Sequence, residues 1–263
     1  MTGRLPLVVV TRDERYDDTL SRALAARGTR PLALQTIAVE PAEDLGPLRA
    51  ALAGTSGGGW IVFTSAHAVD VACGAAPSGA GRTTFAPARV AAVGRRTAAR
   101  LAAYGIDADL VPEDASAAGL AAALSAACDL RGCRVVWPTG DLARPELAEA
   151  LGRAGARLDA IEVYRTVAVR PAGLDAFVRD LGAGSVDAVL FLSPSSARGL
   201  AAALPDGTLA SLAGHTLVGS IGPTTTRMLE ALGVVEVVEP PDRSAESLAD
   251  TVVHALLARR VQV

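Results

Sequence analysis

The chain has 263 residues and a formal net charge of −3; half of its residues are hydrophobic, and only 3% are aromatic. This length suits one large domain or two ordinary ones, with a core built mainly from Ala, Val and Leu. The slight negative charge excludes a general field that would attract nucleic acid or an acidic membrane, but it allows a local basic pocket.

Short apolar runs alternate along the chain with segments in which Ala, Leu and Arg recur at helical spacing. The runs predict strands at 7–11, 31–40, 60–65, 89–94, 108–112, 134–139, 157–169, 188–193, 216–222 and 235–240. The segments between them predict helices near 17–27, 44–53, 66–75, 95–104, 116–127, 144–154, 174–182, 195–204, 223–232 and 245–259. Strict alternation and almost wholly apolar strands indicate an α/β fold with parallel sheets covered by helices on both faces.

The two halves of the chain are copies of each other. A constant offset matches Phe63 with Phe191 (191 − 63 = 128) and Gly94 with Gly222 (222 − 94 = 128). The same offset places Thr97 on Thr225. An offset that holds over this length predicts an internal duplication of a half with five strands and five helices.

Two predicted strands, 31–40 and 157–169, are long for parallel strands and occupy equivalent places in the halves. Strands of this length can leave one sheet and continue toward another. Crossings near 36–41 and 163–171 would interleave the domains, with 1–37 and 168–263 forming a discontinuous domain and 38–167 a continuous one. The alternative is one half per domain, with long strands that merely overrun. The residues alone support the two arrangements equally.

The cysteines Cys73, Cys128 and Cys133 have no C-x-x-C spacing, and the three histidines are scattered. We therefore expect no metal site and no disulfide scaffold, and a reducing compartment. The N-terminal apolar run is too short for the core of a signal peptide. No run approaches the roughly 20 apolar residues of a membrane span. We expect a cytoplasmic protein that does not bind membranes.

Ligands of open parallel α/β sheets collect where the strands end. Hydroxyl groups, Gly and Arg follow the predicted strands at helix starts, where free N–H groups and partial positive charge favour carboxylate or phosphate. For each single loop the alternative is simple N-capping, for which Ser and Thr are preferred. Together the loops predict an anion-binding cleft. Its candidate residues are Arg12, Ser65, Gly94, Thr97, Arg144, Ser193, Ser195, Gly222, Thr224 and Thr225.

Nucleotide-binding and hydrolase motifs are missing. The sequence has no G-x-x-x-x-G-K-[ST], and the glycine-rich segment at 54–60 precedes a predicted strand instead of following one. The nucleophile elbow G-x-S-x-G is also absent. A P-loop, a dinucleotide site and a serine hydrolase are therefore disfavoured.

Several segments together resemble one family. They are "VVVTRDE", "IVFTSAHAV", "VAAVGRRTAARLAAYG", "ARPELAEALGRAG", "IEVYRTV", "VLFLSPSSARGL" and "SIGPTTTRMLEALG". Each is loose, but they cover almost the whole chain in the order found in uroporphyrinogen-III synthases, and the chain is identified as resembling that family.

The resemblance implies the interleaved arrangement: two flavodoxin-like domains, each a five-stranded parallel sheet with helices on both faces, joined by a two-stranded hinge. It also implies a reaction, in which hydroxymethylbilane loses water, its ring D is inverted, and the macrocycle closes to uroporphyrinogen III. The substrate is a linear tetrapyrrole with eight carboxylates, and the resemblance implies neither a cofactor nor a metal. Nothing in the sequence suggests an obligate interface, so we expect a monomer.

Carried over by the resemblance, Tyr164 in "VYRT" is a recurrent tyrosine of the family, near the hinge, whose phenol would assist departure of the hydroxyl. The alternative is a tyrosine that braces the hinge. Thr97 and Thr225 match the Thr after the glycine of each copy, and Ser65 and Ser193 match the strand-end Ser. A different class of function also stays open at this point: a two-lobed α/β protein that binds a small anionic molecule without catalysis.

Overall fold

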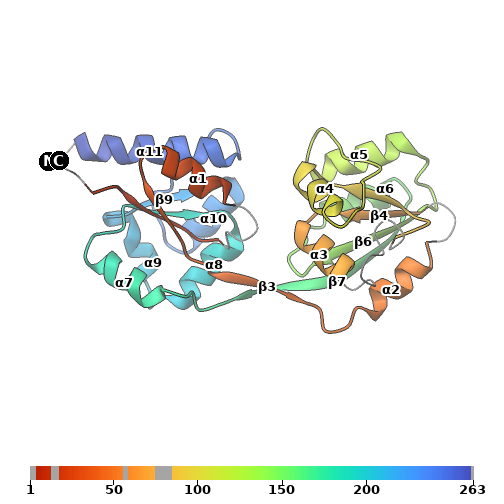
Figure 1. Cartoon of the computed structure of the whole chain (residues 1–263), viewed down its shortest axis with the longest axis horizontal. Coiled ribbons are helices and arrows are strands. Elements are labelled where there is room, and N and C mark those ends of the chain that lie inside the picture. Colours follow the sequence, from red (N-terminus) through yellow and green to blue (C-terminus); the bar gives the residue numbers. More distant parts are fainter. Residues whose placement is uncertain (1–3, 13–17, 56–58, 75–84, 262–263) are drawn as a thin grey trace. The chain divides into compact units, whose positions relative to one another are not determined.

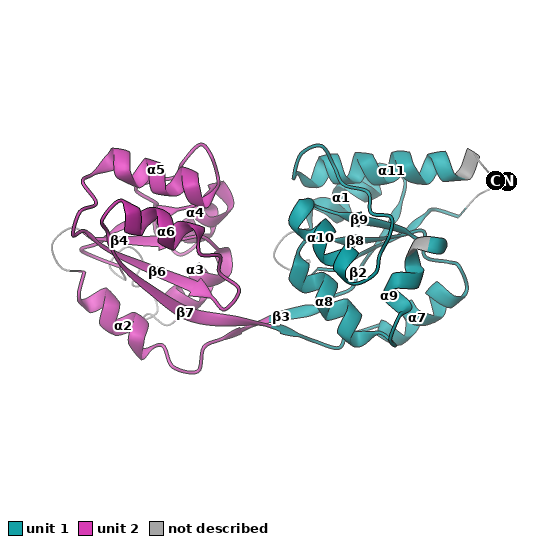
Figure 2. Cartoon of the chain, turned by 180° about the vertical axis from the view of Figure 1, so that it is seen from behind, with its two compact units in different colours: residues 1–38, 167–263 teal, residues 39–166 magenta. Residues whose placement is uncertain are grey.

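The computed structural model describes residues 4–12, 18–55, 59–74 and 85–261 (Figure 1). The ends of two predicted helices, at 17 and 75, and part of the glycine-rich segment, 56–58, lie outside the described residues. The chain divides into two compact units, which Figure 2 colours separately: unit 1 is Met1–Ala38 with Val167–Val263, and unit 2 is Val39–Thr166. Both boundaries fall inside strands, β3 (Ile37–Pro41) and β7 (Arg157–Ala168).

Unit 1 is built on four parallel strands in the order β2-β1-β8-β9. They are β1 (Leu7–Val10), β2 (Arg30–Ala33), β8 (Ala188–Phe191) and β9 (Leu217–Ser220). The helices of this unit are α1 (Thr19–Ala26), α7 (Leu174–Gly182), α8 (Pro194–Ala203), α9 (Thr208–Ser211), α10 (Pro223–Ala231) and α11 (Ala245–Val261), with a 3₁₀ turn at Leu212–Gly214.

Alternation along β1 explains why both faces of this sheet are covered. Leu7 and Val9 point into a core formed with α7, α8, α9 and α10, whereas Val8 and Val10 point into a second core formed with α1 and α11. All four side chains are buried, as expected for a central strand of a parallel sheet. The predicted arrangement of helices on both faces is therefore confirmed for this unit.

Unit 2 contains the five-stranded sheet β3-β7-β6-β4-β5. Its strands besides β3 and β7 are β4 (Trp60–Phe63), β5 (Arg89–Ala92) and β6 (Arg134–Gly140). One core lies under α2 (Gly46–Ala53), α3 (Ala66–Gly74) and α4 (Arg95–Ala102), and the other lies under α5 (Ala117–Ala127) and α6 (Glu146–Arg153). Both tryptophans of the chain, Trp60 and Trp137, belong to the second core.

The prediction of two five-stranded parallel sheets is wrong in detail. Unit 1 has four strands, and the fifth strand of the other sheet is β3, which runs antiparallel to β7. Two backbone hydrogen bonds show this direction, from Ala42 N to Val163 O at 2.8 Å and from Val169 N to Thr36 O at 3.1 Å.

The predicted strands at 108–112 and 235–240 form only single bridges, Leu110 with Ala91 and Val238 with Gly219. Each segment reaches a proline within two residues of its bridge, and a proline has no N–H to continue the ladder. The predicted strand 31–40 is split in two. Between β2 and β3 the Thr36 hydroxyl donates to the Ser196 carbonyl oxygen at 3.0 Å, so this part of the chain bonds to α8 instead of a neighbouring strand.

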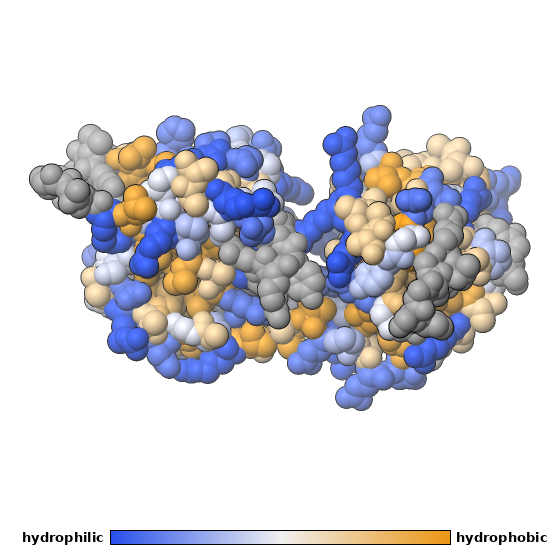
Figure 3. Space-filling model, viewed as in Figure 1, coloured by the Kyte–Doolittle hydropathy of each residue, from blue (hydrophilic) through white to orange (hydrophobic). Residues whose placement is uncertain are grey.

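Hydrophilic residues are interspersed with apolar ones on the visible face of each unit (Figure 3). Among the helices that the structure describes, none is both long enough and apolar enough to cross a membrane.

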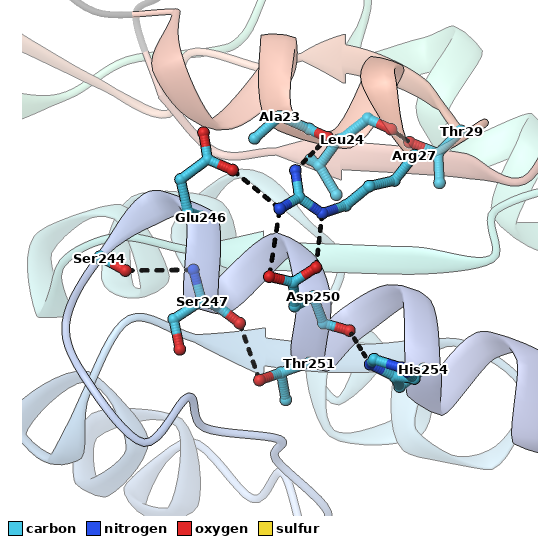
Figure 4. A network of polar contacts seen from close by, with 10 residues as sticks. All are labelled: Ala23, Leu24, Arg27, Thr29, Ser244, Glu246, Ser247, Asp250, Thr251 and His254. Atoms are coloured by element: carbon cyan, nitrogen blue, oxygen red, sulfur yellow. Dashed lines mark hydrogen bonds and ion pairs between the residues drawn. The ribbon is translucent and has the colours of Figure 1, made fainter.

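Arg27 ties the two distant segments of unit 1 together. Its Nε and Nη2 donate to the two carboxylate oxygens of Asp250 at 2.6 and 3.1 Å, and Nη2 lies 2.8 Å from Oε2 of Glu246 (Figure 4). The hydrogen bond with Arg27 is the main reason why the pKa of Asp250 is lowered. Because Arg27 follows α1 and both acids lie on α11, these contacts hold the N-terminal segment to the C-terminal helix.

Replacing Arg27 with Met is expected to lower the midpoint of urea unfolding of unit 1 at pH 7. The depressed pKa of Asp250 makes this contribution present above the unfolded-state pKa and lost as the pH falls through the folded-state value. The difference from wild type should therefore shrink below about pH 4. Far-UV circular dichroism measures the unfolding. Arg22→Met is the matched control, because Arg22, among the described residues, pairs with Asp18 beside its own helix and not with α11. An equal loss in that variant would contradict the prediction.

Candidate functional site

The carboxyl ends of β4, β6 and β7, which are neighbours in the sheet of unit 2, bring three candidate segments together. Ser65 follows β4 directly before α3, and Gly140 ends β6. A shift of register between Thr139 and Gly140 pairs Gly140 with Tyr164 on β7. The structure thus places Tyr164 at the same edge of the sheet as Ser65.

Tyr164 is half-buried and contacts other residues of the site on several sides. The Ser65 hydroxyl lies near its phenol. Its ring meets the His67 ring edge-on, with centroids 6.0 Å apart. A Cβ on Gly140 would lie only 2.3 Å from Cε2 of Tyr164, so the ring rests against bare backbone. The phenol therefore has one defined position.

Burial raises the pKa of Tyr164, the Ser65 hydroxyl lowers it, and the charge of Asp141 raises it further. Asp141 is itself held, because its Oδ1 accepts the Thr166 N–H at 2.9 Å. The phenol consequently keeps its proton through neutral pH and is available as a hydrogen-bond donor or general acid.

The other candidates of unit 2 lie at the same edge, but differ in exposure. Gly94 is the N-cap of α4 with an extended backbone (φ −173°), and Thr97 is buried in the first turn. Arg144 lies exposed before α6. The sequence assigned no role to His67; its backbone N–H donates to Ser65 Oγ at 3.1 Å.

In unit 1 the adjacent strands β1, β8 and β9 end in the remaining candidates. Arg12 follows β1 and is half-buried. Ser193 caps α8: its Oγ accepts the Ser196 N–H at 3.1 Å and lies 2.9 Å from Ser195 Oγ. Gly222 is the N-cap of α10, again with an extended backbone (φ 167°).

The turns at Ser193 and Gly222 show the same use of backbone donors. Each helix has Pro at its first position, which contributes no N–H. The third N–H is used inside each turn, by Ser196 to Ser193 Oγ and by Thr225 to the Gly222 carbonyl oxygen at 2.9 Å. Within the described part of the chain, the second N–H has no partner in either turn. Ser195 and Thr224 therefore each offer one N–H to a ligand, and Thr224 adds its hydroxyl, whereas the Ser195 hydroxyl is bonded to Ser193 Oγ.

Sequence reasoning missed three features of these edges. Gly140 was seen as a strand-end residue, but its contact with Tyr164 depends on the register of β6 and β7. Thr226 Oγ1 joins Ser220 Oγ (2.6 Å) and donates to Glu239 Oε2 (2.5 Å), which braces the turn at Gly222. The side chain of Arg243 crosses Gly222, with Cγ 3.4 Å from the position of a Cβ there. The duplication offered a signal for Arg243, because Ala115 (243 − 128 = 115) packs over Gly94 in the same way.

Among the described residues there is no group of three His, Cys, Asp or Glu side chains placed to hold a metal ion. The donor set of both edges is instead made of hydroxyls, N–H groups and arginines, which bind anions. The fold and these edges define an α/β protein of two units, each suited to binding carboxylates or phosphates where its strands end. The family model described as uroporphyrinogen-III synthase HemD matches residues 18–250. The chain belongs to the uroporphyrinogen-III synthase family.

Individual relatives agree with this assignment. A protein from Methanothermobacter thermautotrophicus, provisionally named uroporphyrinogen-III synthase, is 33% identical over 186 residues, which cover 70% of this chain and 72% of the relative. The uroporphyrinogen-III synthase of Synechococcus elongatus is 26% identical over 236 residues, 88% of each chain. The crystal structure of the Helicobacter pylori uroporphyrinogen-III synthetase shares the fold, with a TM-score of 0.57, 15% identity, and coverage of 98% of this chain and 99% of that one.

Proposed function

We propose that the chain converts hydroxymethylbilane to uroporphyrinogen III, with loss of water and inversion of ring D. Family membership supports the reaction and argues against the alternative of a binding protein without catalysis. The structural observation that carries the proposal is the half-buried Tyr164 phenol, which stays protonated and is held between Gly140 and Ser65 at the edge of the sheet.

The chemistry needs a group that helps a hydroxyl leave. The substrate loses the hydroxyl of its hydroxymethyl group as water and becomes an azafulvene. The substituted carbon of ring D then attacks this azafulvene, forming a spiro-pyrrolenine that rearranges and closes the macrocycle. Tyr164 donates its phenolic hydrogen bond, or its proton, to the departing oxygen. The remaining acceleration comes from holding the flexible bilane so that ring D reaches the azafulvene carbon.

The strand-end turns of both units would hold carboxylates of this substrate. Ser195 and Thr224 offer N–H donors in unit 1, to which Thr224 adds its hydroxyl, while Gly94 and Thr97 lie at a helix start in unit 2. Helix N-termini favour a carboxylate through their donors and their partial positive charge. Arg12 and Arg144 would add charge-assisted hydrogen bonds.

The two units would then act as separate domains joined by β3 and β7. This role follows from the position of the unit boundaries, which fall inside these two paired strands. Because each unit has its own buried cores, a change of backbone angles in the paired strands would leave both cores intact. We further propose that the protein acts as a monomer, because each unit already contains its complete set of strand-end turns.

The test is to incubate the protein with hydroxymethylbilane and to separate the type I and type III uroporphyrin isomers after oxidation. Type III should dominate, and type I alone would overturn the proposal, because the uncatalysed closure gives type I. Tyr164→Phe should lower kcat roughly tenfold with little change in KM. This is less than the roughly 100-fold or more that full proton transfer contributes, because a hydrogen bond to the departing oxygen assists it only in part. Ser125→Ala is the control for loss of a hydroxyl elsewhere in unit 2, because the Ser125 hydroxyl bonds only within α5, to the Ala121 carbonyl oxygen, among the described residues. Unchanged turnover in Tyr164→Phe would reduce Tyr164 to a bracing residue.

A further inference from the structure

A polar cluster lies between α3 and α4, outside the candidate site. Arg100 donates through Nε to Oδ1 of Asp70, and the same oxygen accepts the Tyr104 hydroxyl at 3.1 Å. The Arg100 guanidinium also lies over the Tyr104 ring, 5.2 Å from its centroid. Asp70 belongs to α3 and Arg100 to α4, so this cluster joins two helices by directional bonds.

The cluster is costly in its present form. The second carboxylate oxygen of Asp70, Oδ2, is buried and has no hydrogen-bond partner among the described residues. The neighbouring Cys73 thiol stays neutral, because burial, followed by the charge of Asp70, raises its pKa to about 12. The Asp70 side chain is partly buried, and a carboxylate that leaves one buried oxygen unsatisfied stabilises a fold less than apolar packing of the same shape would.

The duplication shows that the fold does not require this cluster. The equivalents of Arg100 and Tyr104 in unit 1 are Met228 (228 − 100 = 128) and Leu232 (232 − 104 = 128). Both pack against an apolar core between α8 and α10, as does Ala201, the equivalent of Cys73. The equivalent of Asp70 is Arg198 (198 − 70 = 128), which is exposed. The same pair of helices therefore packs with an Asp–Arg pair at these positions in one copy and with apolar side chains facing the core in the other.

What distinguishes the helices of unit 2 is their connection to Tyr164. Ser65, whose hydroxyl lies near the Tyr164 phenol, immediately precedes α3, and His67 in the first turn of α3 meets the Tyr164 ring. Asp70 lies in the same helix about one turn further on. Gly94 and Thr97 lie at the start of α4, and Arg100 follows Thr97 by about one turn. The ion pair thus joins the middle of α3 to the last turn of α4, and both helices begin at candidate site residues.

We propose that Asp70 and Arg100 are positioning residues, which fix the axial and rotational setting of α3 and thereby the place of Ser65 and the Tyr164 phenol. Apolar contacts allow a helix to slide by a fraction of an ångström, whereas a short ion pair with a second hydrogen bond from Tyr104 sets one geometry. Catalytic groups need to be held within about 0.5 Å of their productive geometry, which justifies the loss of stability. This inference rests on the proposed role of Tyr164.

The test gives Arg100 and Tyr104 the apolar side chains of their equivalents in unit 1 and removes the carboxylate, in the triple variant Asp70→Ala, Arg100→Met and Tyr104→Leu. We expect a urea midpoint at or above that of wild type. We expect kcat to fall roughly tenfold with little change in KM, since misplacement by a fraction of an ångström acts on the chemical step. Adding Tyr164→Phe to the triple variant should lower kcat by a much smaller factor than the same change does in wild type.

The control is the double variant Asp129→Ala and Arg131→Met, which removes an exposed ion pair of the same unit and should leave kcat unchanged. Arg100→Lys is the second probe: it keeps the charge and removes the Nε donor, and it should lower kcat while the protein stays folded. The proposal is overturned if the triple variant and Arg100→Lys keep the wild-type kcat. It is also overturned if the combined variant loses kcat by the product of the two separate factors, that of the triple variant and that of Tyr164→Phe. Isomer III from the wild-type protein tests the function itself, so failure of the function and failure of the positioning role give different results.

Discussion

Phe63→Ala is expected to destabilise unit 2 by about 3–5 kcal/mol, the range for truncating a buried phenylalanine. Phe63 is fully buried at the end of β4, and its ring packs against Phe85 with centroids 5.5 Å apart. Truncation removes this contact and leaves a cavity beneath α3 and α4, which the surrounding sheet cannot close. The loss amounts to a shift in the unfolding equilibrium of more than 100-fold.

The tryptophans make this effect measurable for one unit. Both Trp60 and Trp137 are in unit 2, so their fluorescence in urea reports that unit, while far-UV circular dichroism reports both. Phe63→Ala should move the fluorescence transition to lower urea. The matched control is Phe191→Ala, the equivalent position of unit 1, which should move the circular dichroism transition and leave the fluorescence transition in place. A shift of fluorescence worth less than about 1 kcal/mol in Phe63→Ala would contradict the predicted cavity cost.

The location of the helices and strands followed from local chemistry. Apolar runs such as 60–63 form buried strands, and Ser116 caps α5 by accepting the Gly119 N–H at 3.0 Å, as a Ser before an Ala/Leu segment predicts. The number of strands in each sheet did not follow from local chemistry. Whether 108–112 adds a strand or a single bridge depends on how far a neighbouring strand accompanies it, which is a property of the packed sheet.

In the candidate site, too, local sequence predicts some features, whereas others depend on how segments pack. Ser193 was found because a hydroxyl residue follows a strand and precedes a helix, and its capping bond is the local consequence. Gly140 and Arg243 were not found, because their importance lies in what packs against them. The first depends on a register shift between β6 and β7, and the second on the path of a loop that follows Val238. Periodicity along one segment contains no information about such contacts, although the duplication marks the position of Arg243.

Gly140→Ala should lower kcat roughly 100-fold, a larger effect than removal of the Tyr164 hydroxyl. The new Cβ would lie 2.3 Å from Cε2, 2.5 Å from Cζ and 2.9 Å from the hydroxyl of Tyr164, all well inside van der Waals contact. To relieve this overlap the ring must move by about 1 Å, which is enough to cost about 100-fold when the moved group takes part in the chemistry. The edge-on contact with the His67 ring would be lost at the same time.

A loss of activity could also come from a strained sheet, and two variants separate these causes. Gly152→Ala adds the same methyl group on α6, where nothing lies within 4 Å of the new Cβ, and it should keep wild-type kcat. Gly140→Ala combined with Tyr164→Ala removes the overlap, so it should recover the urea midpoint that Gly140→Ala loses, without recovering kcat. If Gly140→Ala alone keeps the wild-type kcat, activity does not depend on the present position of the ring, and Tyr164 cannot be the group that assists the departing hydroxyl. If instead stability returns in the double variant while turnover does not, the bare backbone at Gly140 serves the phenol, and this glycine belongs to the site as much as the tyrosine does.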